Sequence, residues 1–265
     1  MFLPILEYLA ESFGPLRIFN YFTFRAILAT LTSLVFILLL GKTFIKFVAK
    51  QKYGQIIREE GPQSHLEKKG TPTMGGLLIL FSIVFSCLCW GDLNNKYLLI
   101  SIAVTFLFGV IGLVDDYLKL RFSDSKGLSG KSRLFWEILV AICASTIIYF
   151  FATSVEETTL FLPFFKDFAL QLGIWFILFS SLVLVATANA VNLTDGLDGL
   201  AIMPSVMVAA GMGIIAYISG NAILSDYLNV PYLFYSTEIV IFCGALVGAG
   251  IGFLWFNTYP AQIFM

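Results

Sequence analysis

Seven stretches of mostly apolar residues alternate with polar segments along the chain. Each stretch approaches or exceeds the roughly 18 apolar residues that mark a membrane-spanning helix. We therefore predict an all-α fold, a polytopic integral membrane helical bundle of about seven transmembrane helices. The predicted spans are Tyr21–Gly41, Met74–Trp90, Tyr97–Val114, Leu134–Ala152, Leu172–Val191, Leu200–Ser219 and Ile239–Phe256.

Composition favours a membrane protein without a separate soluble domain. Of the 265 residues, 58% are hydrophobic and 12% are charged. A soluble domain of this length does not need so much apolar surface. We expect residues 1–265 to form a single integral membrane domain, with residues 1–20 as an interfacial segment. Arg25, near one end of the first span, is expected to snorkel toward the polar interface.

Lysine and arginine placement predicts the orientation in the membrane. Twelve of the sixteen basic residues lie in two polar segments, 42–73 and 115–133. By the positive-inside rule these segments are cytoplasmic and the N-terminus lies outside. The polar residues that follow the fifth and seventh spans then face the cytoplasm as well. Four polar regions are thus expected to meet on one face of the bilayer.

The segment 189–199, between the fifth and sixth spans, is the richest in candidate chemistry. A charge inside hydrocarbon costs on the order of 3 kcal/mol, so clustered polar residues beside two spans need a reason. Side-chain oxygens without soft ligands suit a hard cation, magnesium first. The alternative is a polar turn between two spans. Four oxygen-bearing residues recur at every third position: Asn189, Asn192, Asp195 and Asp198.

Two further segments carry candidate polar groups. Asp115 and Asp116 close the third span, with Lys119 one turn further on. Paired carboxylates can bind a divalent cation, or one of them can act as a general base. The alternative is an ordinary polar helix end. The segment 71–76 contains hydroxyls, a proline and two glycines, which suits either an anion site at a helix N-terminus or ordinary capping.

Four segments are long and specific, occur in order and extend from the first polar loop to the end of the chain. They are Thr71–Gly76, Asp115–Lys119, Asn189–Leu200 and Phe253–Met265. Together they resemble the phospho-N-acetylmuramoyl-pentapeptide transferase family. The wider superfamily uses polyprenyl phosphate and UDP-aminosugars, and the first and third segments are similar to the muramoyl branch rather than the N-acetylglucosamine branch.

The resemblance implies a magnesium-dependent transferase in the inner membrane of a bacterial cell. UDP-N-acetylmuramoyl-pentapeptide would give its phospho-sugar to undecaprenyl phosphate, and the products would be lipid I and UMP. In such a phosphoryl transfer the metal neutralises the pyrophosphate, and positioning does most of the rest. The lipid bilayer is a partner, a homodimer is left open, and no nucleic-acid partner is expected.

The resemblance also implies roles for individual residues. Asp115 would act on the lipid phosphate as a base or a nucleophile, so that direct attack and a covalent aspartyl intermediate both stay open. The implied catalytic residues are Asp115, Asp116, Lys119 and Asp195, and the implied Mg²⁺ ligands are Asp115, Asp116, Asn192 and Asp195. The implied substrate-binding residues are Lys69, Thr73, Lys131, Asn189, Asn192, Gly196, Leu197, Asp198, Asn257 and Phe264.

Two other classes remain alternatives. One is a polyprenyl-phosphate N-acetylglucosamine-1-phosphate transferase, which a competition assay between two UDP-sugars would separate. The other is an ion-coupled transporter, whose site would lie near the membrane midplane. The carboxylates here lie at span ends on one side, which favours an interfacial enzyme.

This sequence differs from the family in one respect. Members of the family continue beyond the Phe-Met pair with a Gly-Asp pair, further spans and a histidine-rich loop, whereas this sequence ends at Met265. We therefore expect residues 1–265 to be C-terminally incomplete, inactive on their own and poorly stable in detergent.

Overall fold

The computed structural model describes residues 2–50, 71–122, 127–162 and 168–265, and in these ranges the chain is almost entirely helical. The elements, in order, are α1 (Leu3–Ser12), η1 (Gly14–Asn20), α2 (Phe22–Lys50), α3 (Gly75–Trp90), α4 (Lys96–Phe122), α5 (Gly130–Phe151), η3 (Val155–Thr158), β1 (Thr159–Phe161), β2 (Ala169–Gln171), α6 (Trp175–Thr194), α7 (Ile202–Ser219), α8 (Ala222–Leu228), η4 (Phe234–Ser236) and α9 (Thr237–Asn257).

The prediction of an all-α membrane bundle is confirmed. Within the described ranges, six helices are long and apolar enough to cross a membrane: α2, α4, α5, α6, α7 and α9. The second predicted span, Met74–Trp90, is the shorter apolar helix α3 of 16 residues. At 1.5 Å per residue α3 is about 24 Å long, which is less than the ~30 Å hydrocarbon core.

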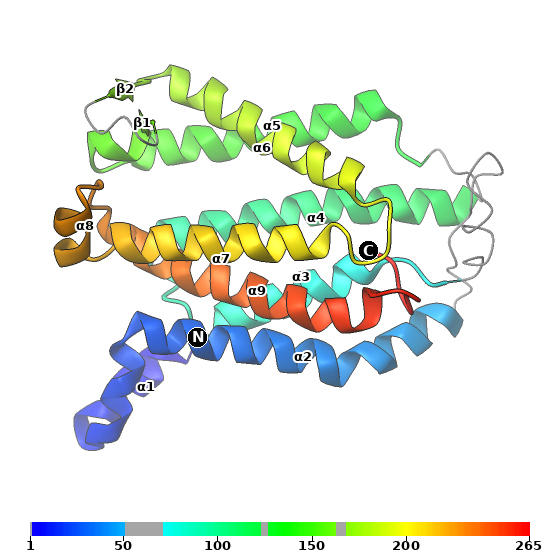
Figure 1. The fold of residues 1–265 in the computed structure, drawn as a ribbon, viewed down its shortest axis with the longest axis horizontal. Coiled ribbons are helices and arrows are strands. Elements are labelled where there is room, and N and C mark those ends of the chain that lie inside the picture. Colours follow the sequence, from blue (N-terminus) through cyan, green and yellow to red (C-terminus); the bar gives the residue numbers. More distant parts are fainter. Residues whose placement is uncertain (1, 51–70, 123–126, 163–167) are drawn as a thin grey trace.

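The long helices lie side by side (Figure 1). Helix α9 is the centre of the packing, and its chief neighbours are α2, α7 and α3. Phe253, Phe256 and Ile241 of α9 are almost completely buried. Small residues allow this close approach: a Cβ at Gly248 would lie 2.0 Å from the carbonyl oxygen of Thr30 on α2. Small residues on α9 therefore permit close helix packing.

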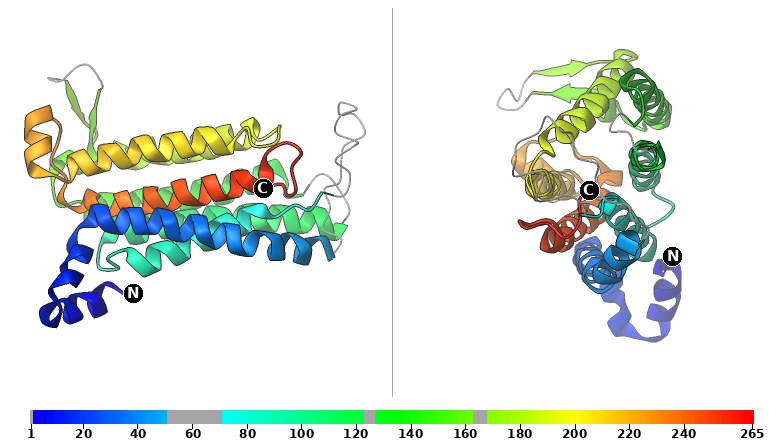
Figure 2. Two further views of the ribbon diagram at one scale, coloured as in Figure 1. Left: turned by 60° about the horizontal axis from the view of Figure 1, so that its bottom comes forward. Right: turned by 90° about the vertical axis from the view of Figure 1, so that its right-hand side faces the viewer.

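The helices α5 and α6 form a separate pair. They pack mainly on each other, and α5 also packs on α4. Figure 2 shows this pair on one side of the bundle, with α1 and η1 on the opposite side. The short antiparallel strands β1 and β2, which the sequence did not predict, connect α5 to α6 and pair Leu160 with Leu170. The helices α5 and α6, with Asp195 at the C-terminal end of α6, carry half of the polar residues of the candidate site described below.

Arg25 does not snorkel as expected. Its side chain is 7% exposed and forms an ion pair with Glu238 of α9, with Nη2 lying 2.6 Å from Oε1. Arg25 Nη1 also donates to the carbonyl oxygen of Trp90 at 3.0 Å, and the backbone N–H of Asp92 donates to Glu238 Oε2 at 2.8 Å. The carboxylate partner keeps the guanidinium inside the protein, so the pair joins α2, α9 and the end of α3.

Two helices extend further than predicted, into the polar segments that follow their apolar spans. Helix α2 continues from the predicted end at Gly41 to Lys50. Helix α4 continues through Asp115 and Asp116 to Phe122, so the two carboxylates lie within its last turns. The spacing of the aspartates and Lys119 explains the longer α4, because side chains three and four residues apart form ion pairs along a helix.

Candidate active site

The segments expected to meet do so at one end of the bundle, where α4, α6 and α9 end (Figure 1). The end of the chain lies against the turn that precedes α3. Phe264 donates its backbone N–H to the carbonyl oxygen of Pro72 at 2.9 Å, and its own carbonyl oxygen accepts from the N–H of Gly75 at 2.8 Å. The segments 71–76 and 258–265 are therefore joined through their main chains.

Two side chains tie the loop after α6 to the segment after α9. Asn257 is buried, its Oδ1 accepts from the N–H of Gly199 at 2.9 Å, and its Nδ2 donates to the carbonyl oxygen of Ile263 at 2.9 Å. Asp198 Oδ2 accepts from the N–H of Ala261 at 3.3 Å. Gly199 has a φ of +71°, a conformation that side chains disfavour. The third and fourth distinctive segments thus form one unit.

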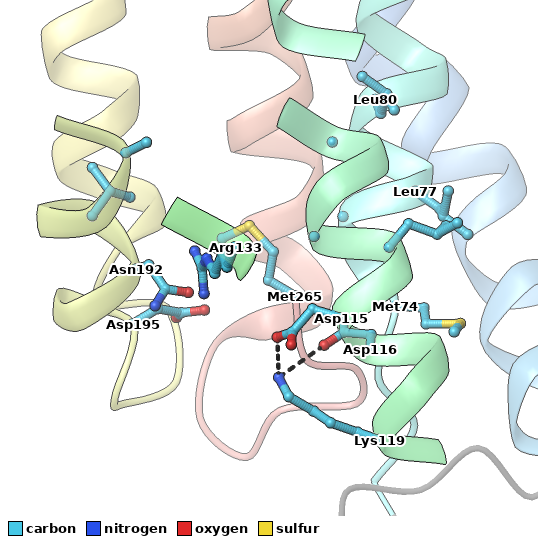
Figure 3. Close-up of a pocket in the computed structure, with 16 residues that line it drawn as sticks. Met74, Leu77, Leu80, Asp115, Asp116, Lys119, Arg133, Asn192, Asp195 and Met265 are labelled. Atoms are coloured by element: carbon cyan, nitrogen blue, oxygen red, sulfur yellow. Dashed lines mark hydrogen bonds and ion pairs between the residues drawn. The ribbon is translucent and has the colours of Figure 1, made fainter. Parts of the chain in front are cut away.

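Asp115, Asp116 and Lys119 form a cluster at the end of α4 (Figure 3). Lys119 Nζ lies 2.6 Å from Asp115 Oδ2 and 3.3 Å from Asp116 Oδ1. The other oxygen of Asp115, Oδ1, accepts from the backbone N–H of Leu128 at 2.7 Å. Asp115 is buried, whereas Asp116 and Lys119 remain partly exposed. The lysine therefore compensates two carboxylates and holds both in fixed positions.

The opposite wall of the site comes from the end of α6. Asn192 and Asp195 lie there and face the α4 cluster in Figure 3. Although Asp195 as a residue is exposed, desolvation raises the pKa of its carboxyl, and the nearby charge of Asp198 raises it further. The two walls come from α4 and α6, which are separated in sequence but share one pocket.

The pocket between these walls has a volume of about 300 Å³ and two chemically different parts. One part is polar, and the other is an apolar wall formed by α3, α4 and α6. The polar lining residues are Asp115, Asp116, Lys119, Arg133, Asn192 and Asp195, and the others are Met74, Gly76, Leu77, Leu80, Gly109, Gly112, Leu113, Ala188, Val191 and Met265. A ligand with an anionic head and an apolar tail matches this division.

Five of the predicted site residues therefore line one pocket: Asp115, Asp116, Lys119, Asn192 and Asp195. Eight of the others are described by the structure but do not line this pocket. Thr73 precedes the pocket residue Met74, and Asn189 lies one turn before Asn192 on α6. Gly196 and Leu197 are exposed in the loop after α6, Lys131 is exposed at the start of α5, and Asp198, Asn257 and Phe264 join loops as described above. Lys69 lies outside the described residues.

Two charged residues on α5 were not among the predicted site residues. Arg133 lines the pocket, and its Nε donates to Glu137 Oε1 at 2.8 Å. Glu137 is 2% exposed and was not considered. A signal was available, because an arginine and a glutamate four residues apart at the start of an apolar helix can pair on one face.

Among the described residues, no three His, Cys, Asp or Glu side chains lie close enough to form a metal site. Magnesium nevertheless does not require a cage made only of protein groups. It is usually held by one or two carboxylates, with waters and substrate phosphates completing the octahedron. The oxygen donors of Asp115, Asp116, Asn192 and Asp195 on one pocket fit that pattern.

The fold and pocket describe a polytopic membrane protein with a polar, anion-compatible site at one end of its bundle. Residues 98–265 match the family model of glycosyl transferase family 4, and residues 68–80 match signature 1 of phospho-N-acetylmuramoyl-pentapeptide-transferase. The class is thus a phospho-sugar transferase. The chain belongs to glycosyl transferase family 4, and its signature segment is that of the phospho-N-acetylmuramoyl-pentapeptide transferases.

Proposed function

We propose that this protein transfers phospho-N-acetylmuramoyl-pentapeptide from its UDP derivative to undecaprenyl phosphate, which gives lipid I and UMP. The observation that carries the proposal is the two-part pocket. Its polar part, with Lys119 and Arg133 among the carboxylates, suits phosphate groups. Its apolar wall suits the first units of a polyprenyl chain. The two substrates would therefore meet at the ends of α4 and α6.

The proposed transfer needs one bond to form and one to break. An oxygen of the lipid phosphate attacks the phosphorus that carries the sugar, and the bond from that phosphorus to the bridging oxygen of UMP breaks. Asp115 is the proposed base that accepts a proton from the lipid phosphate. Lys119, held between Asp115 and Asp116, offsets negative charge that would otherwise repel an incoming phosphate.

Magnesium is the proposed cofactor. Asp115, Asp116, Asn192 and Asp195 would hold it, and when bound it neutralises charge on the pyrophosphate. The nucleotide end is proposed to lie toward the joined loops. The substrate-binding residues proposed there and nearby are Lys69, Thr73, Lys131, Asn189, Asn192, Gly196, Leu197, Asp198, Asn257 and Phe264.

The proposed location is the inner membrane of a bacterial cell, with the pocket facing the cytoplasm and the N-terminus in the periplasm. The basic residues of segments 42–73 and 115–133 support this orientation. The soluble UDP-sugar would then reach the pocket from the cytoplasm, while the lipid phosphate waits at the same face. We also propose that residues 1–265 belong to a single transferase domain and that two copies of the protein can form a homodimer.

The test is UMP release from two competing donors. The chain, continued through the further segment of the family, is supplied with UDP-N-acetylmuramoyl-pentapeptide, UDP-N-acetylglucosamine and undecaprenyl phosphate, and the lipid products are identified by mass spectrometry. We expect only the muramoyl product, and we expect EDTA to stop its formation and added Mg²⁺ to restore it. A lipid product that carries N-acetylglucosamine would replace the proposed donor, and turnover in excess EDTA would remove the metal from the proposal.

The expectation that residues 1–265 alone are inactive is tested in the same assay. UMP release by this chain is compared with release by the same chain continued through the further segment of the family, which we call the continued chain. Comparable turnover of the two would show that the site needs nothing beyond Met265.

A further inference from the structure

A buried glutamate on α5 is not used by the proposed mechanism. Glu137 is 2% exposed, although carboxylates are rarely buried unless they are paired. Both of its oxygens are bound: Oε1 accepts from Arg133 Nε at 2.8 Å, and Oε2 accepts from the side-chain amide of Asn189 on α6. The partners compensate a desolvation cost that would otherwise be large.

The arginine that Glu137 binds reaches the pocket. Arg133 lines the same cavity as the α4 cluster, and its side chain is 24% exposed (Figure 3). Glu137 engages the inner nitrogen, Nε. The terminal nitrogens, Nη1 and Nη2, make no hydrogen bond with another residue of the described ranges. A guanidinium fixed at Nε presents its remaining donors in a defined plane, which suits a phosphate.

We infer that Glu137 is a positioning residue that holds the Arg133 guanidinium so that its terminal nitrogens bind a phosphate group in the pocket. The inference rests on the proposed function, to which it adds a phosphate-binding pair on α5. The shared ligand chemistry is a phosphate oxygen, which either the nucleotide or the lipid phosphate can supply. Through Asn189 the same carboxylate also links α5 to the α6 wall that carries Asn192 and Asp195.

The first experiment is a double-mutant cycle on binding, which needs no turnover. Inorganic pyrophosphate is titrated by calorimetry into the purified chain and into Glu137→Gln, Arg133→Lys and the double variant. We expect each single variant to bind about tenfold more weakly. We expect the double variant to bind no more weakly than Arg133→Lys, because Glu137 acts through Arg133.

Glu238→Gln is the matched control. Glu238 is also a buried glutamate that binds an arginine, but its partner is Arg25, away from the pocket. This variant should lose thermal stability and keep the wild-type affinity for pyrophosphate. The inference is overturned if the effects of Glu137→Gln and Arg133→Lys multiply in the double variant. It is also overturned if Glu137→Gln binds as wild type does, or if the wild-type chain does not bind pyrophosphate.

A second titration identifies which phosphate is bound. UDP and geranyl phosphate replace pyrophosphate as probes. Weaker binding of UDP by Glu137→Gln assigns the nucleotide, and weaker binding of geranyl phosphate assigns the lipid phosphate. Unchanged affinity for both probes contradicts the inference.

Turnover separates this inference from the proposed function. In the continued chain, Glu137→Gln should raise the KM of the substrate whose phosphate is bound more than it lowers kcat. If the wild-type continued chain releases no UMP from either UDP-sugar, the proposed function fails, while a non-additive pyrophosphate cycle still supports the Glu137–Arg133 pair. Normal turnover, together with effects of Glu137→Gln and Arg133→Lys on pyrophosphate binding that multiply in the double variant, would support the proposed function and overturn the role of the Glu137–Arg133 pair.

Discussion

Gly127 lies so close to Asp115 that a Cβ at this glycine would be 2.4 Å from Asp115 Oδ1. The same Cβ would lie 2.9 Å from Cγ and Cε of Lys119. Gly127 also has a φ of +54°, where side chains are disfavoured. The backbone after α4 therefore covers the carboxylate, and the N–H of Leu128 binds it.

Gly127→Ala should displace Asp115 and Lys119, because the added methyl group occupies their space. We expect UMP release by the continued chain to fall by about 100-fold, since small displacements of catalytic groups are costly. Circular dichroism should show an unchanged helix content. Gly130→Ala is the control, because a Cβ there meets nothing within 4 Å. Equal activities of the two variants would contradict this interpretation of the contact.

In the continued chain, Asp115→Asn should lower UMP release by about 1,000-fold, because the proposed base loses its charge while its shape is kept. The amide can still pair with the N–H of Leu128 through its oxygen, so the protein should remain folded. Asp226→Asn, on the short helix α8, should release UMP at the wild-type rate. Near-wild-type transfer by Asp115→Asn would remove this residue from the proposed mechanism.

Single cysteines test the proposed orientation. Gln63 and Ser125, in the two basic segments, lie outside the described residues, so Thr258 serves as the position at the pocket end. Thr158 and Thr258 are at opposite ends of the bundle. In a variant without native cysteines, Thr158→Cys in intact cells should react with an impermeant thiol reagent, and Thr258→Cys should react only after lysis. The reverse pattern would invert the proposed topology.

The buried Arg25–Glu238 ion pair predicts an asymmetry in stability. Glu238→Gln leaves the guanidinium without its counter-charge and should destabilise the protein by about 3–5 kcal/mol. Replacing both partners, as Arg25→Met with Glu238→Leu, should cost less, because no charge then stays buried. Thermal unfolding in detergent measures both variants. A double variant less stable than Glu238→Gln would show that the hydrogen bonds to Trp90 and Asp92 matter more than the charge.

Gly248→Ala should loosen the α2–α9 contact. Its Cβ would lie 2.0 Å from the Thr30 carbonyl oxygen, so the helices must separate at a cost of about 3 kcal/mol. Gly211→Ala on α7 is the matched control, because a Cβ there meets nothing within 4 Å. That control should be neutral or slightly stabilising. Unfolding temperatures that do not differ between the variants would show that the contact can relax.

The spans and their meeting point were predictable because both follow from local composition. Apolar length fixed the helices, and basic residues at alternate loops required the polar segments to lie at one end. The end of α4 was less predictable, because the paired aspartates read as a break in an apolar run. Their ion pairs with Lys119 instead extend the helix to Phe122.

The site was predictable only where its residues belong to distinctive segments. Asp115, Asp195 and Asn192 were found in this way, and they line one pocket. Glu137 was not, because its role depends on its contacts with Arg133 and with Asn189 of a different helix. The burial of Arg25 was not predicted for the same reason, because its carboxylate partner Glu238 is separated from it by 213 residues.

The main-chain hydrogen bonds between Phe264 and the turn before α3 place different limits on substitutions at Phe264 and at Gly75. Phe264 and Pro72 pair through main-chain atoms, so substitutions of the Phe264 side chain leave the join itself intact. Gly75 is different, since a Cβ there would lie 2.5 Å from the ring of Phe253 and 2.7 Å from the Phe264 carbonyl oxygen. The main-chain join should therefore tolerate substitutions at Phe264 and should not tolerate a side chain at Gly75.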